Sequence, residues 1–322
     1  MLRRWFFLSL CGMCLVLVPS GVARAGGAIR GYVLLPALGR VAFVNIDAAR
    51  VVDSVAVARG SGPLAASIDG SRVLVANTRF GLVTQIDGIR TRRVRRFAHL
   101  GRPVALVLVP QPQVGLVRPR YAVVADARGS IDVLDLVSGR VASRVPVVRP
   151  AALALENGRL WVSSAGEATL TQFDLSIPTH PRRVGRARPG MLIAALTPFE
   201  TSSSAGVDVV SPRGALTRVD GYSLTSKTLR RLAGRFTQLL DGYGGVVWAA
   251  ASDGRVLGVP TNDRSAPYVM RVPRASRLEI VGGWLAAAHA RSLRMFALGT
   301  HRPPRTIQLP ATASTIAFAV LP

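Results

Sequence analysis

Cysteine is nearly absent from the 322 residues: Cys11 and Cys14, both close to the N-terminus, are the only two. Past that segment the chain has no disulfide, no thiolate metal site and no cysteine nucleophile. Long apolar runs are equally scarce, because Trp5–Val18 is the longest and falls short of the roughly 20 residues that cross a bilayer. Disulfide scaffolds and membrane-spanning folds are therefore not predicted.

The N-terminal segment has the three parts of an export signal. Arg3 and Arg4 precede the apolar run, and Ala23-Arg24-Ala25 provides an A-x-A cleavage site. We expect residues 1–25 to be a secretory signal peptide, and residues 26–322 to be a protein exported to the cell envelope or the extracellular space. The arginine pair also resembles a twin-arginine signal, which leaves the export route open.

Acidic residues are few, since 17 Asp and Glu stand against 41 Lys and Arg, giving a formal net charge of +24. The signal contributes three of these charges through Arg3, Arg4 and Arg24, so the mature chain carries +21. Such an excess favours an anionic partner. Because Lys227 is the only lysine and Ala, Gly and Val abound, the base composition of a GC-rich genome is the alternative explanation.

What the sequence does contain is a repeat. One apolar β-strand recurs seven times at steps of 38 to 48 residues, the length of a four-stranded propeller blade. The seven runs are Tyr32–Leu35, Val73–Ala76, Tyr121–Val124, Leu160–Ser163, Val207–Val210, Val246–Ala249 and Trp284–Ala287.

The ends of the chain predict how the ring closes. Thr315–Val320 has the pattern of an innermost strand with no strand after it, so it is expected to complete the N-terminal blade. The predicted fold class is all-β: a seven-bladed β-propeller of four-stranded antiparallel blades, formed by residues 26–322 as a single domain and closed by the C-terminal strand.

Aspartates recur at the predicted ends of the third strands. An aspartate there accepts hydrogen bonds from the backbone amides of the following turn. Each stands alone without neighbouring oxygen ligands, so a calcium array is not predicted. The five are Asp47, Asp87, Asp135, Asp174 and Asp220.

The stretch Pro63–Asp87 combines a proline ahead of an inner strand, the turn Ser67-Ile68-Asp69-Gly70, the strand Val73–Asn77 and the strand end Ile86-Asp87. This combination resembles the YVTN-type β-propeller repeat, over residues 30–175 and by strand spacing alone afterwards. The resemblance implies the propeller fold. That family includes exported binding proteins, some of which bind DNA, and is similar in architecture to sugar-lactone hydrolases and quinoprotein dehydrogenases.

Arginine recurs in two loops of each predicted blade, and both loops are expected on one face. Guanidinium groups form forked hydrogen bonds with phosphate, carboxylate and sulfate, so two concentric partial rings of them would hold a polyanion. The arginines before the inner strands are Arg102, Arg149, Arg188, Arg235 and Arg274. Those between the second and third strands are Arg40, Arg79, Arg128, Arg213, Arg255 and Arg291.

Side chains that could take part in catalysis are few. The predicted inner strands consist of small, apolar residues, and Glu279 is the only acid that we assign to one of them. Arg277, two residues earlier on the same face of that strand, is expected to form an ion pair with Glu279. The four histidines lack metal-ligand spacing, and His289 alone lies near the expected site. Neither a metal nor a cofactor is predicted.

We therefore expect a monomeric, non-catalytic binding protein whose arginine face holds nucleic acid, another anionic polymer or an acidic protein surface. The alternative is a propeller enzyme, such as a sugar-lactone hydrolase or a quinoprotein-like dehydrogenase. Several acids or histidines at the channel mouth would favour that alternative.

Overall fold

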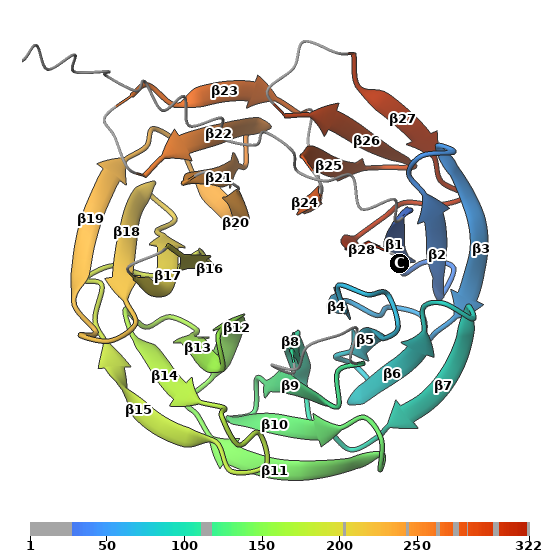
Figure 1. Ribbon diagram of the computed structural model, residues 1–322, viewed down its shortest axis with the longest axis horizontal. Coiled ribbons are helices and arrows are strands. Elements are labelled where there is room, and N and C mark those ends of the chain that lie inside the picture. The colour runs from blue at the N-terminus through green and yellow to red at the C-terminus, as the bar shows by residue number, and fades with distance from the viewer. Residues whose placement is uncertain are drawn as a thin grey trace, which may run out of the picture.

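The computed structural model describes residues 28–110, 118–201, 204–242, 245–261, 265–272, 277–281, 283–298 and 303–320. These residues form seven four-stranded antiparallel sheets arranged as a ring (Figure 1), which confirms the predicted fold class. Within these ranges no helix is long and apolar enough to cross a membrane. The predicted signal, residues 1–25, lies outside them.

The blades follow the chain around the ring, and each is given from its innermost to its outermost strand. Blade 1 consists of β28 (Thr315–Val320), β1 (Ile29–Leu35), β2 (Arg40–Asn45) and β3 (Arg50–Ala56), and blade 2 of β4 (Leu64–Ala66), β5 (Val73–Asn77), β6 (Leu82–Asp87) and β7 (Arg92–Phe97). Blade 3 consists of β8 (Pro103–Val109), β9 (Tyr121–Asp126), β10 (Ser130–Asp135) and β11 (Arg140–Pro146), and blade 4 of β12 (Pro150–Glu156), β13 (Arg159–Ser164), β14 (Leu170–Asp174) and β15 (Arg182–Ala187). Blade 5 consists of β16 (Ala195–Glu200), β17 (Ala205–Val210), β18 (Ala215–Asp220) and β19 (Ser226–Arg231). Blade 6 consists of β20 (Phe236–Gly242), β21 (Val246–Ala251), β22 (Arg255–Pro260) and β23 (Tyr268–Arg271). Blade 7 consists of β24 (Arg277–Val281), β25 (Trp284–His289), β26 (Ser292–Ala297) and β27 (Arg305–Gln308).

The second strand of each blade is buried on both faces, because neighbouring blades pack against it from either side. Every residue of β5 is buried, and in β13 the side chain of Trp161 packs against Val207 and Val209 of the next blade. A strand buried on both faces is expected to be apolar at nearly every position. The exceptions are buried polar residues, such as Asn77 of β5 and Asp208 of β17. The seven apolar runs of the sequence therefore coincide with the seven second strands, as predicted.

The C-terminal strand closes the ring as expected. β28 is the innermost strand of blade 1 and pairs antiparallel with β1, in a register that sets Val320 opposite Ile29 and Thr315 opposite Leu34. Ile316 and Ala319 are buried there. The first and last described strands thus share one sheet, and β1 has no unpaired edge.

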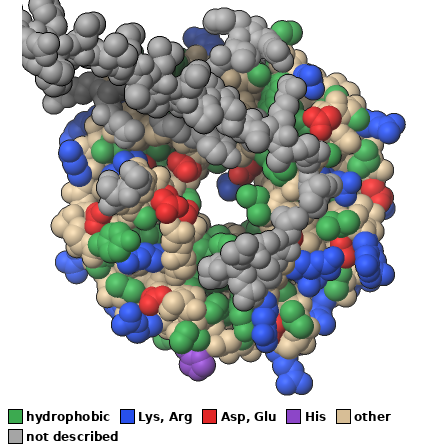
Figure 2. All heavy atoms as spheres, in the orientation of Figure 1, with side chains coloured by type: hydrophobic (Ala, Val, Ile, Leu, Met, Phe, Trp, Pro, Cys, Tyr) green, Lys and Arg blue, Asp and Glu red, His purple; other side chains and the backbone are tan. Residues whose placement is uncertain are grey.

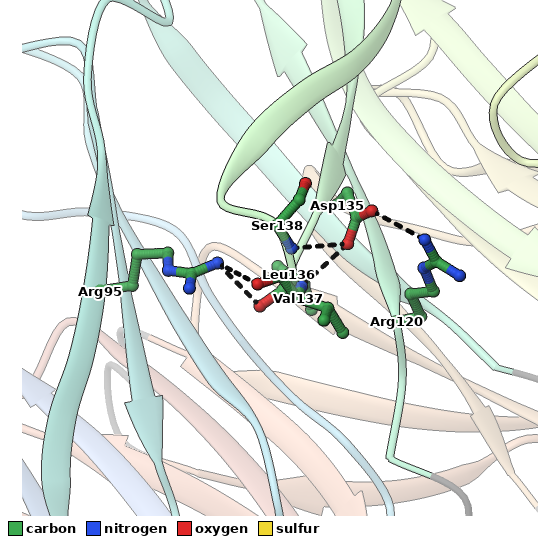
Figure 3. A network of polar contacts seen from close by, with 6 residues as sticks. All are labelled: Arg95, Arg120, Asp135, Leu136, Val137 and Ser138. Carbon is green, nitrogen blue, oxygen red and sulfur yellow. Dashed lines mark hydrogen bonds and ion pairs between the residues drawn. The ribbon is translucent and has the colours of Figure 1, made fainter.

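The recurring aspartates hold turns (Figure 3). Asp135 Oδ1 accepts hydrogen bonds from the backbone N–H of Val137 and Ser138, at 2.8 and 3.1 Å, and Arg120 forms an ion pair with Asp135 at 3.1 Å. Arg95 of blade 2 donates to the carbonyl oxygen of Val137 at 2.6 Å, which links neighbouring blades. Equivalent side chain–backbone bonds occur at Asp87, Asp174 and Asp220.

Blade 1 is the exception to this pattern. Its third strand ends at Asn45, whose side-chain oxygen accepts the backbone N–H of Ala48 at 2.8 Å. The assignment of the role to Asp47 was therefore wrong by two residues, because an asparagine amide oxygen caps the turn as well as a carboxylate.

Candidate functional site

The two arginine-bearing loops of a blade lie side by side. In blades 3, 4 and 6 the turn between the second and third strands donates a backbone hydrogen bond to the carbonyl oxygen of the arginine before the inner strand. The pairs are Ala127 to Arg102 at 2.9 Å, Ala165 to Arg149 at 2.8 Å and Ser252 to Arg235 at 2.8 Å. Because every blade repeats the same strand order, these loops open on one face of the ring, which we call the loop face.

Asp126 fastens this arrangement in blade 3. Its Oδ1 atom accepts the backbone N–H of Arg102 at 2.7 Å and that of Arg128 at 2.9 Å, so one buried carboxylate holds an arginine from each predicted ring. Gly101 adopts a φ of +69°, and a Cβ atom there would lie 2.0 Å from Asp126 Oδ2. Glycine is required at this position for both reasons.

Eight of the predicted site residues are exposed on the loop face and take part in none of the ion pairs found between described residues. Their backbones are fixed by the loops while their guanidinium groups extend into solvent. We call this set the face arginines: Arg79, Arg102, Arg128, Arg149, Arg188, Arg213, Arg235 and Arg291.

The other three predicted arginines differ. Arg40 donates to the side-chain and backbone oxygens of Ser54 at 2.8 and 3.1 Å, which ties it to the outer strand of its own blade. Arg255 forms an ion pair with Asp253 at 2.7 Å and donates to the carbonyl oxygen of Ala233. Arg274 lies outside the described residues. The first two are engaged in contacts within their own blades.

Sequence reasoning missed Arg59, which is exposed in the loop that enters β4 of blade 2. Its carbonyl oxygen accepts the side-chain N–H of Asn77 at 2.8 Å, so this loop too is fastened to the turn beside it. The signal was available in the sequence, because Arg59 precedes an inner strand as Arg102 does. Arg188, by contrast, directly follows β15 and lies seven residues before β16.

A second basic surface lies on the outer rim. The outermost strands β7, β11, β15 and β19 contain no acidic residue, and Lys and Arg (blue) gather at the periphery in Figure 2. Arginine clusters such as Arg92-Arg93-Val94-Arg95-Arg96 were visible in the sequence. They show neither the continuous apolar run of a buried strand nor the apolar–polar alternation of a half-buried one, so they did not predict an outer strand. Part of the positive charge therefore lies away from the loop face.

The central channel has the apolar wall that was predicted. A cavity of about 320 Å³ is lined by the innermost strands, mostly through alanines such as Ala105 and Ala152 and leucines such as Leu153. Gln238 and Arg277 are polar exceptions, and Gln238 accepts the backbone N–H of Leu278 at 2.8 Å.

Acidic residues lie at the opposite ends of the inner strands. Glu156 ends β12, Glu200 ends β16 and Asp241 is the penultimate residue of β20. Figure 2 shows acidic side chains (red) beside the central opening, on the side of β16, β20 and β24. The prediction that Glu279 is the only acid of an inner strand was wrong, because these strands extend further than the sequence pattern suggested.

Burial changes how these acids titrate. It raises the pKa of Glu156 to about 7, with a further contribution from the negative charge of Glu200. Burial likewise raises the pKa of Asp241 to about 6, helped by Asp208. Acids with such values are protonated in part near neutral pH. Among the described residues no three His, Cys, Asp or Glu side chains form a group that fits a metal ion.

Glu279 does not form the expected ion pair. None of the pairs found between described residues includes it or Arg277, and burial raises the pKa of Glu279 to about 7 although the charge of Arg277 opposes that shift. Arg277 instead lines the central channel. His289 ends β25, in the blade position that was predicted.

The class that this fold defines is the β-propeller, and the comparisons with known proteins agree. No protein family and no curated protein matches the sequence. Among solved structures, a functionally unknown protein from Desulfotomaculum acetoxidans is similar with a TM-score of 0.72 and 14% identity, covering 91% of this chain and 99% of that chain.

Two similar structures are parts of named enzymes. Dihydro-heme d1 dehydrogenase NirN, in complex with DHE, has a TM-score of 0.64 and 12% identity, covering 89% of this chain and 74% of that chain. Hydrazine synthase from Kuenenia stuttgartiensis has a TM-score of 0.58 and 14% identity, covering 85% and 90%. At such low identity these likenesses show the fold alone.

Proposed function

We propose that this protein is an exported, non-catalytic β-propeller that holds an anionic ligand on its face arginines. The observation that carries the proposal is the eight exposed arginines on one face, none of which has an ion-pair partner among the described residues. Unpaired guanidinium groups that a rigid scaffold brings to one surface raise the local positive potential. They also offer forked donors to phosphate, sulfate or carboxylate.

The partner that this surface fits is nucleic acid, another anionic polymer or an acidic protein surface. The resemblance to the YVTN-type repeat supports an exported binding protein, and the signal-like N-terminus supports export. We propose that the protein acts as a monomer. The proposed binding needs no metal or cofactor, because charge-assisted hydrogen bonds provide it without a reactive group.

The test is binding of residues 26–322 to fluorescently labelled single-stranded DNA, double-stranded DNA and polyphosphate, with neutral dextran as the control polymer. A face variant replaces Arg79, Arg102, Arg213 and Arg235 by Ser. We expect the wild type to bind at least one polyanion but not dextran. The face variant should lose about tenfold or more in affinity, since each charged contact contributes about 1 kcal/mol or more. An unchanged affinity in the face variant would refute the proposed surface.

The alternative function is catalysis at the opposite mouth of the channel, and the acidic residues there favour it. Glu156 has a pKa of about 7, which suits a general acid or base near neutral pH. Two of the similar structures belong to named enzymes. A Glu156→Gln variant compared with the wild type on sugar lactones and in dye-linked dehydrogenase assays tests this alternative. Turnover by the wild type that the variant lacks would support it.

A further inference from the structure

A cavity of about 370 Å³ opens between blade 3 and blade 4, at the corner where the loop face meets the rim. Four arginines line it: the face arginines Arg128 and Arg149, and Arg183 and Arg186 of the outer strand β15. We infer that this cavity, the corner pocket, is a binding site for a phosphate monoester or a similar tetrahedral dianion carrying an apolar group. The inference rests on the proposed function and gives it a ligand class.

A β-bulge places both outer-strand arginines on the pocket side. Residues three apart on a regular strand point to opposite faces. In blade 4, however, Arg183 lies opposite Phe173 and Arg186 opposite Thr171, because the register shifts between Gln172 and Phe173. Phe173 and Thr171 are two residues apart and both line the pocket, so the two guanidinium groups share that face.

The charge of the corner pocket is unbalanced. Four guanidinium groups line it together with a single carboxylate, that of Glu167, and none of these five groups forms an ion pair found between described residues. The net charge of the lining is therefore +3 when all five groups are ionised. An incoming dianion neutralises most of it, and two or more guanidinium groups can bind one phosphate through forked hydrogen bonds.

The remaining walls define the rest of the ligand. The hydroxyl groups of Ser164, Thr169 and Thr171 supply further hydrogen-bond donors. Phe173 and Val147, both buried, form an apolar wall. The volume lies within the range of small-molecule sites, about 300–1,000 Å³. An anionic head with one ring or a short alkyl group fits this combination better than a bare ion.

The backbone of Arg149 supports a functional role for the pocket. Arg149 has a φ of +36°, an uncommon conformation for a residue with a Cβ atom. Its carbonyl oxygen accepts the backbone N–H of Ala165, which holds the residue in place. Glycine would adopt this conformation at lower cost, so an arginine side chain at this position carries a backbone cost.

Isothermal titration of the wild type with phenyl phosphate, inorganic phosphate and benzoate tests the inference. We expect phenyl phosphate to bind most tightly, because it alone offers both the dianion and the ring. The pocket variant, Arg183→Gln with Arg186→Gln, should weaken phenyl phosphate binding about tenfold or more. Glu167→Gln should tighten it severalfold by removing the opposing negative charge.

Blade 2 offers a matched control, because Arg93 and Arg96 of β7 flank the same kind of bulge, opposite Ile86 and Thr84. The control variant, Arg93→Gln with Arg96→Gln, removes the same charge and should change phenyl phosphate binding less than twofold. Equal losses in the pocket and control variants, or no saturable binding of phenyl phosphate by the wild type, would overturn the inference.

The same proteins separate this inference from the proposed function. The pocket variant should keep its affinity for single-stranded DNA, and the face variant should keep its affinity for phenyl phosphate. If the wild type binds phenyl phosphate but no polyanion, the result refutes polyanion binding by the face arginines and supports the corner pocket as a phosphate site. A 5′-phosphorylated oligonucleotide compared with its unphosphorylated copy shows whether the dianion is the end of a polymer or a free ester.

Discussion

Glu156 is a carboxyl group whose environment opposes its charge. Burial and the neighbouring Glu200 raise its pKa from 4.5 to about 7, so the folded state favours the protonated form. The raised pKa therefore contributes to the free energy of unfolding in full below pH 4.5, where Glu156 is protonated in both states. This contribution is lost as the pH rises through 7 and Glu156 ionises in the folded state. Above pH 7 the ionised Glu156 is a net cost to the fold.

Replacing Glu156 by Gln should therefore stabilise the protein at pH 8 and leave its stability almost unchanged at pH 4. We expect a gain of about 1 kcal/mol, less than the whole pKa shift implies, because the side chain is only half-buried and solvent screens its charge. Urea unfolding at the two pH values measures it. Asp53→Asn is the control, because a side-chain hydrogen bond with Thr91 lowers the pKa of Asp53. A gain of equal size at both pH values would contradict the assignment.

These acids escaped sequence analysis for a local reason. Glu156 is followed by Asn157-Gly158 and Asp241 by Gly242, and such pairs are typical of turns. Turn signals of this kind predict the end of a strand, although the inner strands continue to Glu156 and Gly242. Most face arginines were predictable by contrast, since their loops are marked by Arg-Pro or by Gly beside a strand that was already located, and Arg291 is the exception.

At the scale of strands, the degree of burial determined which strands could be predicted from the sequence. The second strands are buried on both faces, so their apolar runs located all seven blades. The outermost strands are half exposed and carry bulges in blades 1 to 5, which break the two-residue alternation. For that reason Arg183 and Arg186 could not be assigned to one face before the register was known.

The closing strand β28 gives a prediction at the same scale. A chain that ends at Pro310 loses the burial of Ile316 and Ala319 and exposes the edge of β1. We expect it to lose about 4 kcal/mol or more of unfolding free energy, from buried apolar area and strand hydrogen bonds together. Urea unfolding and light scattering measure the loss and the accompanying aggregation.

A circular permutant is the control for this truncation. It places residues 311–320 ahead of Ala28 through a short Gly-Ser turn and ends at Pro310, so that β28 and β1 form a hairpin in the same register. The permutant should recover most of the lost stability. A truncated chain that unfolds at the same urea concentration as the wild type would show that β28 does not close the ring.

On the scale of the whole molecule, charge is unevenly distributed over the surface. Face arginines occupy the loop face, acids lie on one side of the channel at its opposite mouth, and further arginines cover the rim. Composition alone could not show this distribution, because arginine is abundant along the whole chain and the strand order is needed to assign each residue to a surface. The distribution makes a charge-matched comparison of surfaces feasible.

The central claim is that the face arginines, rather than net charge, hold the polyanion. The most direct measurement is the dependence of single-stranded DNA affinity on salt concentration, for the face variant and for a rim variant. In the rim variant Arg50, Arg92, Arg140 and Arg305, which begin outermost strands at the end away from the loop face, become Ser. Both variants lose four charges. Each phosphate contact contributes about 0.7 to the slope of log K against log salt. We predict that the slope falls by about 3 in the face variant and by less than 1 in the rim variant. Equal reductions in the two variants would contradict the account and show that the charge acts diffusely.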